Sequence, residues 1–132
     1  MTATNRPFEL MFISPSEIRM GSPYNHCQIQ FVGLTNIKLE DGWWQDKHAW
    51  TEDNKYLVLI KWNLDNNDPG FHFRVFNTLT GNSLTSDRIM GMVNSLSITD
   101  TKVLYNKFLY IGKAADGNLL DNTDNEFKFK EF

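Results

Sequence analysis

The chain has 132 residues, a length that fits one domain (residues 1–132) with a self-sufficient hydrophobic core. Its net charge of −3 and the lack of any Lys/Arg stripe make nucleic acid a poor partner. The single cysteine, Cys27, cannot form an intramolecular disulfide, and the sequence contains neither a signal-peptide pattern nor an apolar stretch of about 20 residues. We therefore expect a cytoplasmic protein without a membrane segment.

Aromatic and acidic side chains stand out in the composition. Aromatic residues make up 14% of the chain, which favours β structure or a binding face. Residues 40–53 contain five acidic side chains and one basic one, Lys47, and residues 116–126 contain four acidic side chains and no basic one. Such tracts occur as ordinary solvated charge, and they also suit the surface of a basic protein partner.

The N-terminal third of the chain is typical of β-strands. The apolar run over residues 8–13, closed by Ser14-Pro15, predicts a first strand. Alternation over residues 27–32 predicts a second, half-buried strand that ends at Gly33, and residues 34–39 are expected to continue as a further strand.

The middle of the chain predicts a hairpin of two buried strands. Residues 56–62, YLVLIKW, are almost continuously apolar and too short for a typical helix, so we expect a central strand covered on both faces. Residues 63–70 are rich in turn formers, and residues 71–76 alternate as the returning strand would.

The C-terminal third is less regular. Apolar residues spaced as on one helical face suggest a short helix near residues 87–96, with a loop leading into a strand as the alternative. Residues 103–111 predict a strand, or a hairpin bent around Asn106-Lys107. Gly117-Asn118 is typical of a turn, and residues 126–132 predict a final edge strand.

Together these elements predict the fold class. We expect a mainly β protein, a single compact antiparallel β domain of about seven to nine strands with at most one short helix. A sandwich, a barrel and a curved sheet all remain consistent with the sequence.

Nucleophilic and metal-dependent chemistries are not indicated by the motifs. His26 and Cys27 are neighbours that would point to opposite faces of a strand, so Cys27 is expected to be a core residue. His26, His48 and His72 stand apart, without the spacing of zinc ligands. We therefore expect no metal and no activated nucleophile.

An apparent calcium loop also fails on inspection. Residues 65–70 resemble such a loop, but Pro69 occupies a liganding position and Phe76 stands where the bidentate Glu belongs. No glycine-rich phosphate cradle is present, so no cofactor is expected. We predict a protein without enzymatic activity, with an enzyme assembled from residues far apart in sequence as an alternative.

The four tryptophans all lie within residues 43–62. Residues 49–51 predict the end of a strand, Glu52 to Lys55 a tight turn, and Tyr56 the start of the next strand. Trp50 and Trp62 are expected in the core, and whichever of Trp43 and Trp44 is exposed becomes a candidate contact residue.

The order Ala-Trp-Thr-Glu-Asp-Asn-Lys-Tyr-Leu, residues 49–57, resembles the blade motif of TolB-like β-propellers. A propeller needs several blades of about forty residues, and this chain carries one copy of the motif. The longer pattern over residues 44–62, from Trp44-Gln45-Asp46 to Trp62, is similar to small bacterial immunity-like proteins of toxin loci.

The second resemblance implies a non-enzymatic immunity or inhibitor protein that binds and neutralises a cognate bacterial toxin in the cytoplasm. Aromatic side chains would anchor the toxin and acidic loop residues would steer its basic surface. The expected partner-binding residues are Trp43, Trp44, Glu52, Asp53, Asp65 and Asp68. A small-molecule-binding β-barrel with an aromatic-lined cavity is the alternative.

Overall fold

The computed structural model describes residues 6–17, 25–64, 70–114 and 117–132. In these residues the chain forms β-strands and no helix, which confirms the mainly β fold class. The described strands are β1 (Phe8–Glu17), β2 (Asn25–Gly33), β3 (Trp44–Trp50), β4 (Tyr56–Asn63), β5 (Gly70–Asn77), β6 (Ser83–Thr85), β7 (Ile89–Met90), β8 (Met92–Thr99), β9 (Lys102–Ala114) and β10 (Gly117–Lys128).

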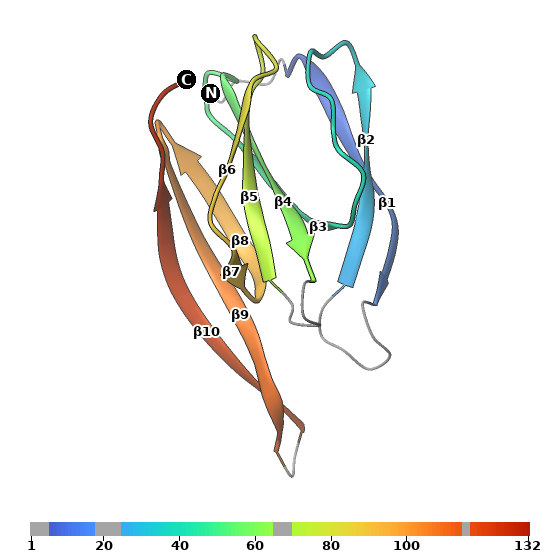
Figure 1. Ribbon diagram of the computed structural model, residues 1–132, viewed down its shortest axis with the longest axis vertical. Helices are drawn as coiled ribbons and strands as arrows, with labels where there is room; N and C mark the ends of the chain where they lie inside the picture. The colour runs from blue at the N-terminus through green and yellow to red at the C-terminus, as the bar shows by residue number, and fades with distance from the viewer. Residues whose placement is uncertain (1–5, 18–24, 65–69, 115–116) are drawn as a thin grey trace.

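The strands make two antiparallel sheets (Figure 1). The larger sheet has the order β1-β2-β3-β4-β5-β6, with β7 paired to β5, and the smaller sheet has the order β10-β9-β8. β2 joins β3 through the single pair Cys27 and Trp44, and the β1–β2 hairpin packs over one face of β4. The three-stranded sheet packs over the opposite face. β4 is therefore covered on both faces, as predicted.

Alternate residues of β4 supply two cores. Tyr56, Val58 and Ile60 face β8 and β9, whereas Leu57 and Leu59 face the β1–β2 hairpin. All five side chains are 0–2% exposed. β4 therefore connects the two largest apolar clusters. Burying each of these aliphatic or aromatic side chains contributes about 1.5–3 kcal/mol of transfer free energy to folding.

The predicted helix near residues 87–96 is wrong, because these residues form β7 and β8. Gly91 separates the two strands with φ of 109°, and a Cβ there would lie 2.4 Å from the Phe108 carbonyl oxygen. A bulge in β8 between Val93 and Ser95 then puts Val93 and Leu96 on the same core-facing side. The extra residue of the bulge spaces these two core-facing side chains three residues apart instead of two, which matches the spacing of side chains on one face of a helix.

Other boundaries also differ from the sequence predictions. Residues 34–43 contain no strand; this strap crosses the larger sheet, with Ile37 buried beneath it. β1 continues through Pro15, which an edge strand tolerates, and a bulge lies between Ile13 and Ser16. The described strands number ten, above the seven to nine expected.

The C-terminal hairpin is longer than expected. β9 runs as one strand through Asn106-Lys107, without a bend into a hairpin. Gly117-Asn118 begins β10 and pairs with Ala114 and Lys113, so the predicted turn there and the start at Glu126 are both wrong. β10 is nevertheless an edge strand of its sheet, as predicted.

Candidate functional site

A tight turn connects β3 and β4, as predicted, and in it the Asn54 N–H donates to the Thr51 carbonyl at 3.0 Å. Asp53 Oδ1 accepts hydrogen bonds from the backbone N–H of Lys55 at 3.0 Å and from Thr51 Oγ1 at 2.8 Å, and these bonds lower the pKa of Asp53 below its usual value. Asn54 takes φ of 65°, a conformation that Asn tolerates well. Glu52 and Asp53 are both exposed. The turn therefore holds two carboxylates at the surface.

Two other loops lie at the same end of the molecule as this turn. Thr78 donates its N–H to the Lys55 carbonyl at 2.9 Å, and Asn36 Nδ2 donates to the Leu79 carbonyl at 2.8 Å. Gly81 has φ of 81°, and its ideal Cβ would lie 2.5 Å from the Asn36 carbonyl oxygen. We call residues 34–36, 51–55 and 77–82 the loop end.

The loop end carries the two most exposed large apolar side chains among the described residues. Leu34 is 92% exposed and Leu79 is 74% exposed. The backbone that presents Leu79 is fixed by Asn77 Oδ1, which accepts hydrogen bonds from the N–H groups of Leu79 and Thr80 at 2.9 and 3.2 Å. A backbone that is already fixed loses little conformational freedom on binding, so an apolar side chain that it presents suits contact with another protein.

Trp43 lies at the opposite end of β3 from the acidic turn. The seven residues of β3 separate the two positions by about 20 Å. Trp43 is 40% exposed and stacks on His26, with ring centroids 3.9 Å apart and an interplanar angle of 5°. Burial lowers the pKa of His26 below its usual value. The exposed tryptophan and the acidic turn thus belong to different surfaces.

Trp44 is a core residue. It is 2% exposed, its carbonyl lies 3.5 Å from Cys27 Sγ, and Lys61 Nζ lies 5.8 Å from its ring centroid. Cys27 is buried beside it, as predicted, and burial, helped by the charge of Asp46, raises the pKa of its thiol to about 11. Two of the predicted contact residues, Asp65 and Asp68, lie outside the described residues.

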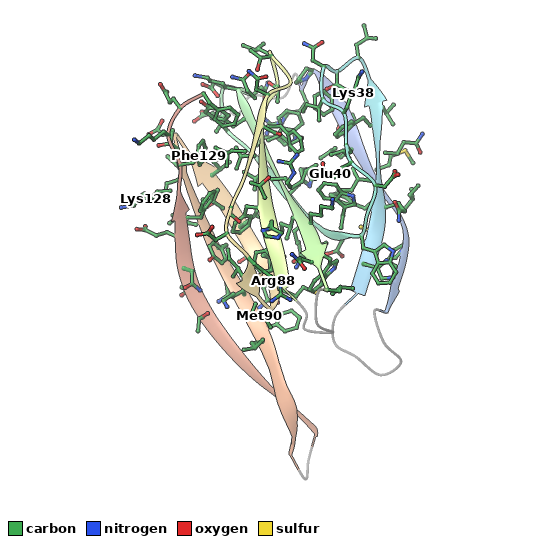
Figure 2. All side chains as sticks on the ribbon, viewed as in Figure 1. Lys38, Glu40, Arg88, Met90, Lys128 and Phe129 are labelled. Atoms are coloured by element: carbon green, nitrogen blue, oxygen red, sulfur yellow. The ribbon has the colours of Figure 1, made fainter. Side chains whose placement is uncertain are left out.

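A polar cleft of about 360 Å³ opens where the strap passes over β4 and β5. Glu40 of the strap, labelled in Figure 2, accepts hydrogen bonds from Arg74 Nε at 2.8 Å and Nη2 at 3.2 Å, and Lys61 Nζ lies 3.3 Å from the same carboxylate. Burial opposes ionisation of Glu40, but Arg74 and Lys61 outweigh it and hold the pKa of the carboxyl below its usual value. These bonds fasten the strap to the sheet.

The remaining polar groups of the cleft also have protein partners. Arg74 Nη1 donates to the Leu84 carbonyl at 3.1 Å and to Thr85 Oγ1 at 2.8 Å. The two ring nitrogens of His72 contact the Ser86 carbonyl at 2.8 Å and Asn63 Nδ2 at 2.9 Å. Because this arrangement leaves its charged groups engaged within the protein, we interpret the cleft as a structural network.

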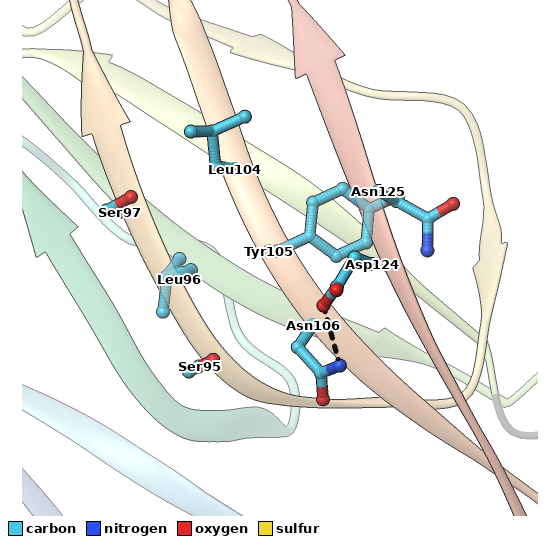
Figure 3. Close-up of a pocket in the computed structure, with 8 residues that line it drawn as sticks. All are labelled: Ser95, Leu96, Ser97, Leu104, Tyr105, Asn106, Asp124 and Asn125. Atoms are coloured by element: carbon cyan, nitrogen blue, oxygen red, sulfur yellow. Dashed lines mark hydrogen bonds between the residues drawn. The ribbon is translucent and has the colours of Figure 1, made fainter.

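A second, shallow hollow of about 500 Å³ lies on the three-stranded sheet (Figure 3). A row of hydrogen bonds crosses the sheet beside it, from Asn94 Nδ2 to Asn106 Oδ1 at 2.8 Å and from Asn106 Nδ2 to Asp124 Oδ1 at 2.9 Å. Cross-strand polar pairs of this kind stabilise a solvent-facing sheet surface.

The described residues contain no group of three His, Cys, Asp or Glu side chains placed to hold a metal ion. They also contain no helix long and apolar enough to cross a membrane. No family model matches the sequence, and comparisons with curated proteins and with solved structures give no significant match.

Sequence analysis did not identify Leu34 and Leu79 as candidate contact residues. A signal for Leu79 was present, because the residue stands inside the turn-forming sequence Asn-Thr-Leu-Thr-Gly-Asn, where an apolar side chain has no strand face to occupy. Leu34 likewise stands next to a turn-forming residue, because it directly follows Gly33. An apolar residue in the middle of a turn is therefore the feature that locates the loop end.

Proposed function

We propose that this protein is a non-enzymatic binding protein whose loop end contacts and blocks a cognate bacterial toxin in the cytoplasm. The single observation that carries the proposal is the exposure of Leu34 and Leu79 on loops that are hydrogen-bonded to each other. The resemblance over residues 44–62 to immunity-like proteins supplies the kind of partner.

The chemistry of the loop end supports a basic protein surface as the partner. Leu34 and Leu79 offer apolar area, and Glu52 and Asp53 add negative charge on the neighbouring turn. Interface energy concentrates in a few well-placed side chains, while complementary charge speeds association and favours the correct partner. A toxin that acts on nucleic acid would present such a basic surface around its own site.

The proposal is tested by a growth assay with the product of the neighbouring gene. Cells that make this product alone are expected to stop growing, and cells that also make this protein are expected to survive. The double variant L34D/L79D is expected to lose protection, because two buried carboxylates would weaken the complex by far more than about tenfold.

A matched control separates binding from folding. Met11 on β1 and Val32 on β2 are apolar residues that are 48% and 47% exposed, so the double variant M11D/V32D introduces the same two charges at another surface and is expected to protect fully. Thermal melting of each variant shows whether the fold is retained. Survival of cells that make the neighbouring product without this protein, or full protection by folded L34D/L79D, would refute the proposal.

A further inference from the structure

Asn77 closes the loop that carries Leu79. It is the last residue of β5, it is buried, and its Oδ1 accepts the N–H groups of Leu79 and Thr80. Its backbone N–H donates to the Asn82 carbonyl, and its carbonyl accepts the Gly81 N–H, both at 2.8 Å. The loop is therefore held through one buried residue at the point where it leaves the sheet.

The other polar atom of the Asn77 side chain binds the segment that follows β10. Its Nδ2 donates to the Phe132 carbonyl oxygen at 2.7 Å. The Tyr56 hydroxyl donates to the same oxygen at 3.3 Å, and it lies 3.1 Å from the Phe132 nitrogen, whose N–H it accepts. We call residues 129–132 the closing segment. In Figure 1 this segment ends near the start of β4, at the same end of the molecule as the loop end.

The register of the larger sheet explains why two side chains meet one residue of the closing segment. Tyr56 and Asn77 are directly paired residues of β4 and β5, so their side chains lie on the same face of the sheet. The Phe132 ring packs there with centroid distances of 5.3 Å to Tyr56 and 6.1 Å to Phe129. The closing segment is thus docked by ring packing and by hydrogen bonds to one cross-strand pair.

The partners of the Asn77 side chain require an amide at this position. The loop presents backbone N–H groups, which only donate, and Phe132 presents a carbonyl oxygen, which only accepts. An amide carries an acceptor and a donor on one plane, whereas a carboxylate of the same shape would turn a second acceptor toward the Phe132 carbonyl. The amide therefore links the position of the closing segment to the position of Leu79.

We propose that Asn77 is a positioning residue of the loop end: through it, docking of the closing segment holds Leu79 in the arrangement that contacts the partner. This inference rests on the proposed function, which makes Leu79 a contact residue. A loop that adopts its bound arrangement one tenth of the time binds about tenfold more weakly. Because coupling between two sites is reciprocal, a partner that binds Leu79 also holds the closing segment in place.

Tyr56→Phe separates this positioning role from a local role of Asn77 in its own loop. The substitution removes the hydroxyl that binds Phe132 and leaves every atom of Asn77 and of the loop in place. Within the part of the chain that the structure describes, that hydroxyl makes no hydrogen bond to residues 78–82. If Asn77 acted within its loop alone, Leu79 would not respond to this change.

Amide hydrogen exchange of the full chain, followed by NMR, tests the coupling. In Tyr56→Phe we expect exchange at Leu79 and Thr80 to rise about tenfold, the effect of losing about one net hydrogen bond from the docked state. Tyr105→Phe is the matched control, because it removes the hydroxyl of another tyrosine of the same core, one whose ring contacts Phe71 and Phe73. Unchanged exchange in Tyr56→Phe, or an equal rise in both variants, would overturn the proposal.

Asn77→Asp tests the amide itself. It keeps an acceptor for the N–H groups of Leu79 and Thr80 but loses the donor to Phe132, so exchange at Leu79 is expected to rise at least as much as in Tyr56→Phe. Tyr56→Phe, the milder change, keeps the test independent of whether Asn77→Asp folds. A folded Asn77→Asp variant with the exchange rates of the parent protein would contradict the positioning role.

The growth assay links the coupling to function. When expression of this protein is lowered stepwise, Tyr56→Phe is expected to need about tenfold more protein than Tyr105→Phe for the same survival. Equal protection by these two variants, together with faster exchange at Leu79, would overturn the positioning role and leave the proposed function standing. If the parent protein gives no protection, the proposed function fails, whereas the exchange rates still decide whether Asn77 couples the closing segment to the loop.

Discussion

The polar cleft and the loop end show opposite relations between side chains and surroundings. In the cleft, Glu40 and Arg74 look functional by residue type, yet each is held by partners within the protein. At the loop end, Leu34 and Leu79 look unremarkable by residue type, yet they project into solvent from fixed loops. Exposed apolar side chains on fixed loops are therefore better candidates for contact with a partner than charged side chains that already have partners within the protein.

The largest loss of stability is expected from removing the Arg74–Glu40 ion pair of the cleft. Arg74 is 13% exposed at its side chain, so Arg74→Ala removes a largely buried guanidinium and leaves Glu40 with Lys61 alone. We expect a loss of about 2 kcal/mol in the free energy of unfolding, below the 3–5 kcal/mol typical of fully buried pairs because Glu40 is 35% exposed. Urea denaturation measures this loss.

The more exposed partner provides the control for that change. Lys61→Met keeps an apolar stem over Trp44 and is expected to cost under about 1 kcal/mol. If Arg74→Ala lowered the free energy of unfolding no more than Lys61→Met does, the bidentate contact between Arg74 and Glu40 would not be what holds the strap to the sheet. The cleft would then become a candidate binding site.

Gly81→Ala is expected to disturb the loop end by a smaller amount. The residue has φ of 81°, and the new Cβ would lie 2.5 Å from the backbone oxygen of Asn36, so the two loops must separate. We expect a loss of about 1–2 kcal/mol and faster amide hydrogen exchange in residues 34–36 and 77–82.

Gly42→Ala, in the strap beside Lys61 of the cleft, is the matched control. Gly42 has φ of 145°, but the atom nearest its ideal Cβ is Cε of Lys61, a flexible side chain, at 2.8 Å. Gly42→Ala should therefore leave exchange at the loop end unchanged. Equal exchange rates at the loop end in both variants would show that the contact between Gly81 and Asn36 does not fix the loops.

Lowering the pH should reduce the stability contributed by the cleft more than the stability contributed by the loop end. The folded-state pKa of Glu40 lies below the usual 4.5, so ionised Glu40 stabilises the fold above about pH 4.5, and this stabilisation is lost as pH falls through the folded-state pKa. The same sign holds for Asp53, but its carboxylate is exposed on a turn. We expect Glu40→Gln to flatten the acid limb of a stability–pH curve more than Asp53→Asn does.

Urea melts of both variants between about pH 3 and pH 7 check this prediction. An acid limb that is unchanged in Glu40→Gln would mean that the bonds from Arg74 and Lys61 do not favour the ionised carboxylate. An acid limb flattened more by Asp53→Asn would place the main acid-sensitive contact in the turn.

The parts of the fold that the sequence predicts are those with local causes. The doubly covered strand β4 and the turn at residues 51–55 follow from an apolar run and from Asp and Asn chemistry within a few residues. The strap is different, because Glu40 meets Arg74 across 34 positions and no local pattern announces the pair.

The candidate site divides in the same way. Glu52 and Asp53 are exposed on the predicted turn, and Trp43 is the exposed member of the Trp43–Trp44 pair. Trp43 precedes β3, whereas Glu52 and Asp53 follow it, so the tryptophan and the acidic turn lie at opposite ends of the strand and do not share one surface. The contact between residues 34–36 and 77–82 arises from tertiary packing, which is why the exposed leucines did not appear as a pair in the sequence.

The smallest effect on stability is expected from the leucines themselves. Leu34→Ser and Leu79→Ser remove side chains that are 92% and 74% exposed, so each variant should unfold within about 0.5 kcal/mol of the parent protein. A large apolar side chain that contributes nothing to folding lowers solubility when it is exposed. Urea denaturation and aggregation measured together test this reasoning: stability should stay constant while resistance to aggregation improves. A loss of more than about 1 kcal/mol in either variant would show that the leucine supports the loops, and the loop end would then resemble the cleft, with its side chains accounted for by structure.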